Sequence, residues 1–538
     1  MYIENVPNRN SPPAILLRES TREGKKTIKR TLANLSSWPV GKVEALKRVL
    51  SGQEVGASSE PPECGRIWAV MDVLNQICDE IGLGDAIGNS KVARLVKFLI
   101  FARLGHQGSR LSAVRWAKEH CVEEILGLKE FDEDDLYGAL DWIASRQDEV
   151  ELKLYKNYLR INNEPPVLVL YDVTSSYFEG ECNEHAEFGY NRDGKKGKKQ
   201  IVIGLLTDVK GEALSVSVFK GNTGDPATVE TQIETLVKRF GIAEVVFVGD
   251  RGMVKTEGKK LCAKANFKYI SCLTDPQIRK FIKSNIIQPS LFDVNVCEVE
   301  SSGKRLILKL DEQTKRKERH RREDKLNVLT AHLKERNAFV VQSKNAQPEA
   351  GLKQLTSWVK KHKLSSFTSL SLKDNQIQIA IDESAKEQDE LLDGCYVIET
   401  DVPKEMMNTQ DAHDRYRDLQ KVERDFRTMK TGLLDVRPIY LRNGERTQGH
   451  VFVAMLGLKL SRAIEQRLSA HFGTTDADPQ ATTLEDAINI VSRLCLLKYT
   501  IGGQEVIGLP KPDARQKEIL DCLKIKLTIP KSKSPQAA

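Results

Sequence analysis

The 538-residue sequence lacks the features that mark several protein classes. Its ten cysteines are scattered and include no CxxC pair, which argues against a disulfide framework and against a structural zinc site. No apolar run approaches the roughly 20 residues that span a bilayer, and the first residues lack the basic-then-apolar order of a secretory signal. We therefore expect a soluble, cytoplasmic protein with reduced thiols.

Aromatic residues are also scarce, at 6% of the chain, and none interrupts the basic runs, so stacking of single-stranded bases is not indicated there. Hydrophobic residues make up 40%, which suffices for the several cores that a chain of this length needs. The net charge of +7 is modest and by itself fits many partners besides nucleic acid.

The cations gather in two runs, which is more informative than their total. The first is a glycine-broken loop with Lys195, Lys196, Lys198 and Lys199, and the second holds Lys315, Arg316, Lys317, Arg319, Arg321 and Arg322. Both are candidates for contact with DNA phosphates. A solvated loop or helix face is the alternative interpretation of either run.

The N-terminal part of the chain is predicted to contain two segments. Apolar and polar residues alternate over residues 14–35 on both sides of a turn at 23–25, which predicts that residues 1–62 form a hairpin followed by a linker. Residues 63–162 have helical periodicity and are interpreted as a helical, DNA-binding domain. Its basic residues are Arg103, Arg110, Arg115 and Lys118, around a glycine that suits a helix-turn-helix. A bundle that packs on the core or dimerises is an equally good interpretation.

After Pro165 the pattern changes to short apolar runs with helices between them. Runs at 167–173, 201–209 and 213–221 predict three strands, and a helix at 227–240, a strand at 244–250, a helix at 258–265 and a strand at 268–273 follow. The order βββαβαβ predicts an α/β fold in which helices flank a sheet. We expect residues 163–289 and 386–470 to form the two parts of this core, 290–385 to be a β-rich insertion, and 471–538 to be a C-terminal helical region with a polar tail.

Two aspartates follow buried strands of the predicted core. Asp172 closes the run VLVLYDV and Asp250 closes EVVFVGD, so both carboxylates are expected at or near the carboxyl ends of strands. Rigid strand ends can hold two such groups in register, and carboxylate oxygens suit hard divalent cations such as Mg²⁺. A lone aspartate at a strand end is usually a turn or cap residue, but two after all-apolar runs favour a functional role.

A third carboxylate is found by placing residues 412–430 on one long helix. An apolar stripe of Leu419, Val422, Phe426, Met429 and Leu433 is then expected to pack on the sheet. A second stripe beside it holds Tyr416, Glu423, Arg427 and Lys430. The helix thus presents a carboxylate next to two cations and a phenol. The alternative is that Glu423 and Arg427 form an ordinary surface pair.

Several blocks resemble those of DDE insertion-sequence transposases, in the branch marked by a Y-x2-R-x3-E-x6-K signature. They are YDVTSSYFEG, GNTGD, VFVGDRGM and YRDLQKVERDFRTMK, together with GYNRDGKKGKKQIVIGLL. Tyr416, Glu423 and Lys430 match the signature in type and spacing, whereas Leu419 stands in place of its arginine. On the helical wheel Arg427 lies close to Glu423, so it is a candidate to supply the missing charge.

The resemblance implies an RNase H-like core in which Asp172, Asp250 and Glu423 hold two ions of Mg²⁺ or Mn²⁺ for cut-and-paste transposition. A pair of ions about 3.5 to 4 Å apart stabilises both the attacking and the leaving oxygen. Tyr416, Arg427 and Lys430 would contact phosphate. The implied partners are double-stranded DNA, as terminal inverted repeats and target, and a second copy in a homodimer. The implied location is the bacterial cytoplasm, at the nucleoid.

Three other functions stay open at this point. One is an RNase H-like metal-dependent nuclease that hydrolyses DNA without joining strands. Another is a catalytically silent DNA-binding protein derived from a transposase, which retention of all three acidic positions disfavours. A third is a phosphotransferase with Asp172 as the nucleophile, for which no second motif is found.

Overall fold

The computed structural model describes residues 1–8, 12–24, 26–52, 62–293, 296–343, 346–474, 478, 481–501 and 504–528. These residues form two compact units. The first comprises residues 1–84, 89–136 and 460–538, and the second comprises 85–88 and 137–459. Within the described residues, no helix combines the length and the apolar character needed to cross a membrane.

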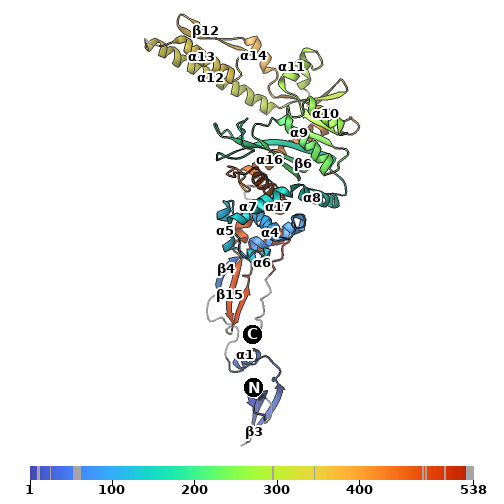
Figure 1. Cartoon of the computed structure of the whole chain (residues 1–538), viewed down its shortest axis with the longest axis vertical. Coiled ribbons are helices and arrows are strands. Elements are labelled where there is room, and N and C mark those ends of the chain that lie inside the picture. The colour runs from blue at the N-terminus through green and yellow to red at the C-terminus, as the bar shows by residue number, and fades with distance from the viewer. Residues whose placement is uncertain are drawn as a thin grey trace. The chain divides into compact units, whose positions relative to one another are not determined.

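The second unit is built on an eight-stranded mixed sheet of order β10-β11-β14-β9-β8-β5-β6-β7. Figure 1 labels its strand β6 and several helices of the same unit. Its strands are β5 (Leu168–Tyr177), β6 (Gln200–Asp208), β7 (Ala213–Lys220), β8 (Val246–Gly249), β9 (Lys268–Cys272), β10 (Cys297–Ser301), β11 (Lys304–Leu310) and β14 (Cys395–Thr400). The pairs β5–β8 and β8–β9 are parallel and the other pairs are antiparallel. With α9 (Asp225–Glu234) and α10 (Thr256–Lys264) between the strands, the predicted order βββαβαβ is confirmed.

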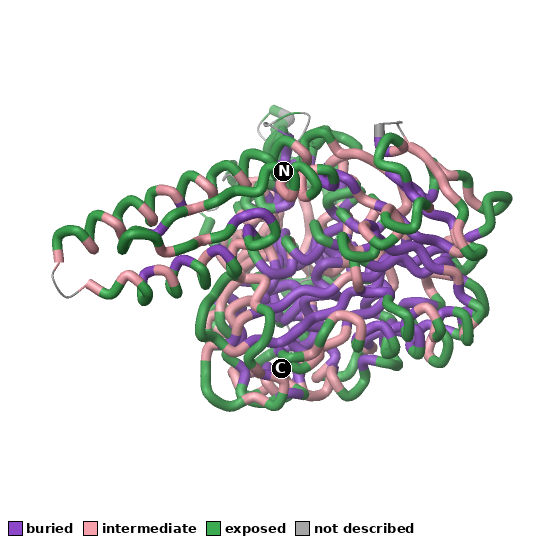
Figure 2. Tube along the Cα trace, turned by 90° about the horizontal axis from the view of Figure 1, so that it is seen from above, coloured by how far each residue is buried: buried purple, intermediate pink, exposed green. Residues whose placement is uncertain are grey.

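The two faces of this sheet carry different helices. Val169, Tyr171 and Val173 of β5 belong to a buried cluster that also contains side chains of α8 (Gln147–Asn162), α9 and α10. Because side chains alternate along a strand, Asp172 and Thr174 face the other side, where α16 (Leu419–Lys430) packs on β5 and β6. Figure 2 shows the buried residues in purple, in long inner stretches of the chain trace, with exposed residues mostly in the outer turns.

A buried carboxylate fastens α8 to the edge of the sheet. Glu151 is fully buried, and it accepts hydrogen bonds from Ser215 Oγ at 2.8 Å and Gln147 Nε2 at 2.7 Å. Arg239, at the end of the π-helical turn Thr235–Arg239 that follows α9, pairs with it. Helix α8 thus packs on the sheet and belongs to the second unit, so the prediction that residues 63–162 form one helical domain is wrong for residues 137–162.

The prediction of a β-rich insertion at 290–385 is wrong. Strands β10 and β11 extend the main sheet, and the longest element is the 31-residue helix α12 (Glu312–Gln342), with α13 (Pro348–Lys361) beside it. Between the 3-10 turn Pro289–Asp293 and α14 (Glu383–Glu390), the other strands are the short hairpin β12 (Thr368–Lys373) and β13 (Gln376–Ile381). The charged stretch forms a helix because Asp311 caps it through Thr314 N at 2.9 Å and its residues are mostly good helix formers.

A partly buried ion pair joins the two strands of the hairpin β10–β11. Arg305 donates from Nε and Nη2 to Glu298 at 3.0 and 2.8 Å, and from Nη1 to the carbonyl oxygens of Val402 and Met407. The hydrogen bonds from Arg305 hold the pKa of Glu298 below its ordinary value. A carboxyl group with a lowered pKa in the folded state stabilises the fold above its unfolded pKa and loses that contribution as pH falls.

We therefore predict that Glu298→Gln lowers the free energy of unfolding at pH 7 by about 1.5–3 kcal/mol. The difference from the wild type should shrink as pH falls through about 4, where the native carboxylate takes up its proton. Urea unfolding at several pH values between 3 and 7 measures it. A difference that stays constant over this range would show that the charge of Glu298 does not contribute.

The first unit contains two small sheets and a group of helices. One sheet has the order β1 (Tyr2–Val6), β2 (Ala14–Glu23), β3 (Lys26–Asn34), and the other has the order β16 (Gln504–Gly508), β15 (Cys495–Ile501), β4 (Glu63–Ile67). The helices are α1 (Val40–Leu50), α2 (Ala69–Glu80), α4 (Lys91–Gly105), α5 (Arg110–Glu119), α6 (Val122–Leu126), α18 (Leu484–Val491) and α19 (Ala514–Cys522). The unit boundaries fall within α3 (Leu83–Ile87), α7 (Glu133–Ser145) and α17 (Gly444–Phe472).

Two predictions about this unit have different outcomes. The N-terminal hairpin is confirmed, because Glu23 pairs with Lys26 and Gly24 adopts φ +62°, a left-handed conformation that favours glycine; Lys25 itself lies outside the described residues. The C-terminal region is not purely helical, since β15 and β16 form a hairpin that pairs with β4. The predicted polar tail lies outside the described residues.

Candidate active site

Strand register places Asp172 and Asp250 next to each other. Tyr171 of β5 and Gly249 of β8 are paired in the parallel ladder, and each aspartate is the next residue. Asp250 follows the last residue of β8, as predicted. Asp172 lies within β5, which continues to Tyr177 because it stays paired with β6 beyond the end of β8. It is therefore at the end of the parallel pairing and not at the end of its strand.

The third carboxylate comes from α16. The prediction of one helix over residues 412–430 is wrong, because α15 (Thr409–Arg417) and α16 are separated at Asp418, which pairs with Arg415 and Lys421. In α16 the stripe Leu419, Val422, Phe426 and Met429 is buried as expected, while Leu433 lies beyond the helix end. Glu423 and Arg427 are on its exposed side, and Tyr416 belongs to the preceding helix.

All three carboxylates line one cavity of about 370 Å³, which we call the catalytic cavity. Arg427 and Lys430 line it too, which confirms that α16 presents these cations beside the acidic residues. The site joins β5, the end of β8, the loop before β6 and α16. The remaining lining residues are Val173, Thr174, Arg192, Asp193, Asp225, Phe426, Thr431 and Arg437.

The three carboxylates interact electrostatically. Burial raises the pKa of Asp172 to about 7, and the charges of Asp250 and Glu423 raise it as well. Burial and the charge of Asp250 also raise the pKa of Glu423, against a lowering effect of Arg427. Asp172 accepts a hydrogen bond from Val173 N at 2.7 Å, and Asp250 accepts one from the Tyr416 hydroxyl at 3.1 Å. A cation between these groups would relieve their mutual repulsion.

Within the described residues, no group of three or more His, Cys, Asp and Glu side chains already has the geometry of a metal site. The chemistry of the donor set nevertheless suits a hard divalent cation, because Asp172, Asp250 and Glu423 offer only carboxylate oxygens. The repulsion that raises the pKa of Asp172 is the property expected of carboxylates gathered for such an ion.

A buried aspartate, Asp193, pairs with two cations of the catalytic cavity, Lys430 and Arg437, which we call the cationic wall. Lys430 Nζ donates to Thr174 Oγ1 at 2.9 Å and pairs with Asp193 at 2.6 Å, and Arg437 pairs with the same carboxylate oxygen at 2.6 Å. The Asp193 side chain is 1% exposed, and its other oxygen accepts from Tyr177 N at 3.1 Å. Burial lowers the pKa of Lys430, which the charge of Asp193 opposes.

Four charged residues of this cavity, Arg192, Asp193, Asp225 and Arg437, were not predicted from the sequence. Arg192, in the loop before β6, pairs at 2.5 Å with Asp225, the first residue of α9. The signal for Arg192 and Asp193 was available in part, because GYNRDG directly precedes the basic loop and belongs to the blocks that carry the resemblance. Arg437 gave no such signal, since only folding brings it to Asp193.

The predicted basic loop adjoins this wall. Lys195, Lys196, Lys198 and Lys199 lie between Asp193 and β6. Lys198 pairs with Glu179 at 2.6 Å, and Lys195 Nζ lies 5.6 Å from the centre of the Tyr177 ring. The other two side chains carry their charge along the same loop. The loop follows Asp193 in sequence, but none of its four lysines is among the described residues that line the catalytic cavity.

The second basic run lies at the start of α12, and its arginines differ in environment. Arg322 forms a two-pronged pair with Asp393 at 2.5 and 2.8 Å, with 11% of its side chain exposed, so it joins α12 to the residues before β14. Arg319 is 3.9 Å from the same carboxylate and is 52% exposed. Arg321 is also exposed. Arg319 and Arg321 are thus more accessible to a ligand than Arg322.

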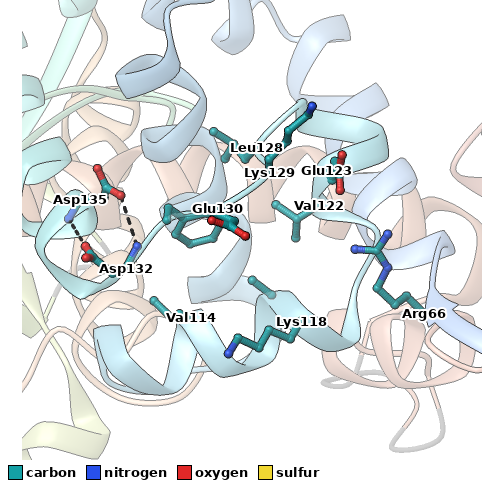
Figure 3. Close-up of a pocket in the computed structure, with 12 residues that line it drawn as sticks. Arg66, Val114, Lys118, Val122, Glu123, Leu128, Lys129, Glu130, Asp132 and Asp135 are labelled. Carbon is teal, nitrogen blue, oxygen red and sulfur yellow. Dashed lines mark hydrogen bonds between the residues drawn. The ribbon is translucent and has the colours of Figure 1, made fainter.

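A larger cavity, of about 660 Å³, lies in the first unit between α5, α6 and the segment before α7 (Figure 3). Its charges have both signs: Arg66, Lys118 and Lys129 face Glu123, Glu130, Asp132 and Asp135. Asp132 and Asp135 accept hydrogen bonds from each other's backbone N–H groups. This mixture does not select a polyanion.

The cations proposed from sequence for end recognition also lie in the first unit. Arg103 is buried in α4, whereas Arg115 and Lys118 are exposed on α5, which begins five residues after α4 ends. Arg110 is half-buried at the start of α5. Only the exposed pair is accessible to a macromolecular ligand.

The part of the chain that contains the catalytic cavity matches a known family. The model of the family described as "Transposase DDE domain" matches residues 163–458, more than half of the chain. Among solved structures, the chain is similar to a piggyBac transposase in a synaptic complex with hairpin DNA, with a TM-score of 0.35 and 8% identity, over 79% of this chain and 76% of that chain. None of the curated proteins matches. The chain belongs to the transposase DDE domain family and is a transposase.

Proposed function

We propose that Asp172, Asp250 and Glu423 are the metal-binding residues of this transposase and that they serve both the cutting and the joining of DNA. The observation that carries the proposal is that three carboxylates from β5, the end of β8 and α16 line one cavity. The strand order β7-β6-β5-β8-β9, in which an antiparallel meander leads into two parallel strands, supports an RNase H-like core.

Several residues in and beside the catalytic cavity have roles in this proposal. Bound Mg²⁺ or Mn²⁺ ions, two per site, supply Lewis acidity and an activated oxygen nucleophile. The Tyr416 hydroxyl holds one oxygen of Asp250 in place. Lys430, oriented by Thr174 and Asp193, neutralises phosphate charge together with Arg427. Hydrolysis at an element end and transesterification into a target use this one site in succession.

The proposal extends to the partners. The DNA is double-stranded, as terminal inverted repeats and as target, and the protein acts as a homodimer. We assign end recognition to the helices within residues 63–162, with Arg115 and Lys118 as the exposed cations. Phosphate contacts that do not depend on sequence are added by Lys195, Lys196, Lys198, Lys199, Arg319 and Arg321.

Metal binding by the three carboxylates predicts how the melting temperature responds to Mn²⁺ and to the loss of one carboxylate. In EDTA, Asp172→Asn should raise the melting temperature by a few degrees, because it removes a charge that Asp250 and Glu423 repel. Mn²⁺ should raise the melting temperature of the wild type but not of the variant, because ligands that bind the folded state stabilise it. Differential scanning fluorimetry measures both effects. Equal stabilisation of the two proteins by Mn²⁺ would place the ion elsewhere.

A plasmid assay separates transposition from simple nuclease action. The donor plasmid carries the coding sequence with its flanking DNA, and the target is a second plasmid. We expect excised donor fragments whose 3′ ends become covalently joined to target DNA in the presence of Mg²⁺. Cleavage without any joined product would instead favour the RNase H-like nuclease.

A further inference from the structure

A second cavity adjoins the catalytic cavity. It has a volume of about 220 Å³. Asp250 and Glu423 line both this cavity and the catalytic cavity. Its other walls come from different elements: β9, β14, the end of α15 and the start of α16. The two carboxylates thus stand between two cavities, of which only the first contains Asp172 and Lys430.

The second cavity contains a cation, Arg417, that has no ion-pair partner among the described residues. Arg417 is exposed, and among the residues that the structure describes none forms a hydrogen bond or ion pair with its guanidinium. Two other charged groups of the wall have partners. Arg251 pairs with Asp275 at 2.8 Å, and Asp311 caps α12. In the catalytic cavity, by contrast, Lys430 is already paired with Asp193.

The hydroxyl groups around Arg417 are held in place. Tyr396 is hydrogen-bonded to His413 Nε2 at 2.6 Å, and His413 Nδ1 lies 2.9 Å from Asp414. The Tyr416 hydroxyl is bound to Asp250. A planar guanidinium next to oriented hydroxyls is suited to a phosphate group, which accepts several hydrogen bonds at once.

Leu419 lines this same cavity, with 6% of its surface exposed. It occupies the position where the signature has arginine, and Arg417 precedes it by two residues. Arg427, the candidate from sequence, lines the catalytic cavity instead. We propose that Arg417 binds a backbone phosphate of the DNA in the second cavity and so supplies the charge that Leu419 lacks. This proposal rests on the DNA-cleaving function assigned to Asp250 and Glu423.

The physical need for such a contact follows from the carboxylates themselves. A DNA strand that passes Asp250 and Glu423 carries one negative charge per nucleotide, which these residues repel wherever no cation intervenes. Lys430 and Arg427 offset that repulsion in the first cavity, and Arg417 offsets it in the second. The strand is then held on both sides of the position where it is cut.

The test compares Arg417→Ala with Arg424→Ala. Arg424 is an exposed arginine of α16 next to Glu423 that lines neither cavity. Binding of a random-sequence duplex oligonucleotide is measured by fluorescence anisotropy over a range of salt concentrations, and cleavage is measured on the donor plasmid. For Arg417→Ala we expect the slope of log K against log salt to lose about 0.9, the value for one phosphate contact. Cleavage should fall by about tenfold or more.

A double variant sharpens the test. Arg417→Ala combined with Leu419→Arg returns a cation to the same cavity and should recover most of the lost cleavage. The proposal is overturned if Arg417→Ala matches Arg424→Ala in both salt slope and cleavage. The stabilisation by Mn²⁺ should stay at the wild-type value in Arg417→Ala. Failure of the metal-site proposal is recognised separately, by Asp172→Ala retaining cleavage.

The first unit contains two neighbouring thiols. Cys64 of β4 and Cys495 of β15 are free thiols on neighbouring antiparallel strands, and their sulfur atoms are 2.7 Å apart. The two thiols are therefore in direct contact across neighbouring strands, which is the proximity that a disulfide bond requires. Cys64 is exposed, so oxidants reach it. We infer that this pair is a redox-modification site that forms a reversible disulfide.

The oxidation proceeds in two balanced steps with a peroxide as oxidant. Hydrogen peroxide transfers one oxygen to the Cys64 sulfur, which gives a sulfenic acid and water. The Cys495 sulfur then attacks the Cys64 sulfur, the S–O bond breaks, and the oxygen leaves as a second water with the thiol proton. The resulting bond closes a loop that contains the whole region matched by the family model.

Full-length protein treated with dilute hydrogen peroxide tests this inference by mass spectrometry of non-reduced tryptic peptides. We expect a peptide pair linked through Cys64 and Cys495 that dithiothreitol separates, and a rise in melting temperature that Cys64→Ser abolishes. Cys182→Ser, which removes another exposed thiol, is the matched control and should leave both results unchanged. Oxidation of Cys64 to the same extent as Cys182, without the linked peptide, overturns the inference.

Discussion

Replacement of Asp172, Asp250 or Glu423 by alanine should abolish DNA cleavage, with a loss of at least about a thousandfold for each. Stabilisation of charge by bound metal contributes several kcal/mol to phosphodiester cleavage, and about 4 kcal/mol corresponds to a factor of about a thousand in rate. The three carboxylates act as a unit, because they line one cavity and the charge of Asp250 raises the pKa of both Asp172 and Glu423. The losses should therefore not add when the substitutions are combined.

The measurement is cleavage of the donor plasmid in Mg²⁺, with binding of duplex DNA measured in parallel. Binding should be largely retained, since removal of a negative charge does not weaken attraction to a polyanion. Glu257→Ala is a suitable control, because this exposed carboxylate of α10 forms a surface pair with Lys260. A single alanine variant that cleaves at nearly the wild-type rate would remove that residue from the metal site.

Asp193→Ala should be among the most destabilising single substitutions in the second unit, at about 3–5 kcal/mol. Asp193 is 1% exposed and pairs with both Lys430 and Arg437, so its removal leaves two cations close together without a counter-charge. The backbone N–H of Tyr177 also loses its acceptor. Urea unfolding measures the loss, and cleavage should fall as well because Lys430 is no longer oriented.

Asp193→Asn separates the two effects. The amide retains the shape and one acceptor for Tyr177, so stability should recover in part, while the ion pairs with Lys430 and Arg437 are lost. Lys260→Ala, at an exposed pair, should change stability by less than about 1 kcal/mol. If Asp193→Ala is no more destabilising than Lys260→Ala, the buried pairs do not hold the cationic wall together.

The central part of the fold could be predicted from the sequence because it depends on local patterns. Apolar runs bounded by turn residues predicted the strands up to residue 273, and the register of β5 and β8 then brings Asp172 and Asp250 together. The buried stripe of α16 was likewise visible as a helical period. These features depend on residues that are close in sequence and on one strand pairing.

The break between α15 and α16 could not be predicted from helical periodicity. A single helix was expected over residues 412–430, yet the two helices are separated at Asp418, where ion pairs with Arg415 and Lys421 hold the junction. The break places Tyr416 on α15, from which its hydroxyl reaches Asp250. Asp250 lies far away in the chain, so the periodicity of one segment carries no information about this contact.

For the inserted residues 290–385, too, local patterns do not determine which sheet a strand joins. Strands were expected within residues 290–385, and β10 and β11 lie there, but only pairing with β14 makes β11 part of the main sheet. The C-terminal hairpin is a similar case. Its strand β15 pairs with β4, which lies in the N-terminal part of the chain. Alternation indicates a strand, and it does not indicate which sheet the strand joins.

The sequence by itself determined the type of each central element, the pair Asp172 and Asp250, and the resemblance that led to Glu423. Only the tertiary structure decided what surrounds them: the pairing of Lys430 and Arg437 with Asp193, and the second cavity in which Arg417 lies beside Leu419. The physical reason is the range of the interactions. Hydrophobic period and strand register are set by neighbouring residues, whereas burial and ion pairing depend on which distant segments the fold brings together.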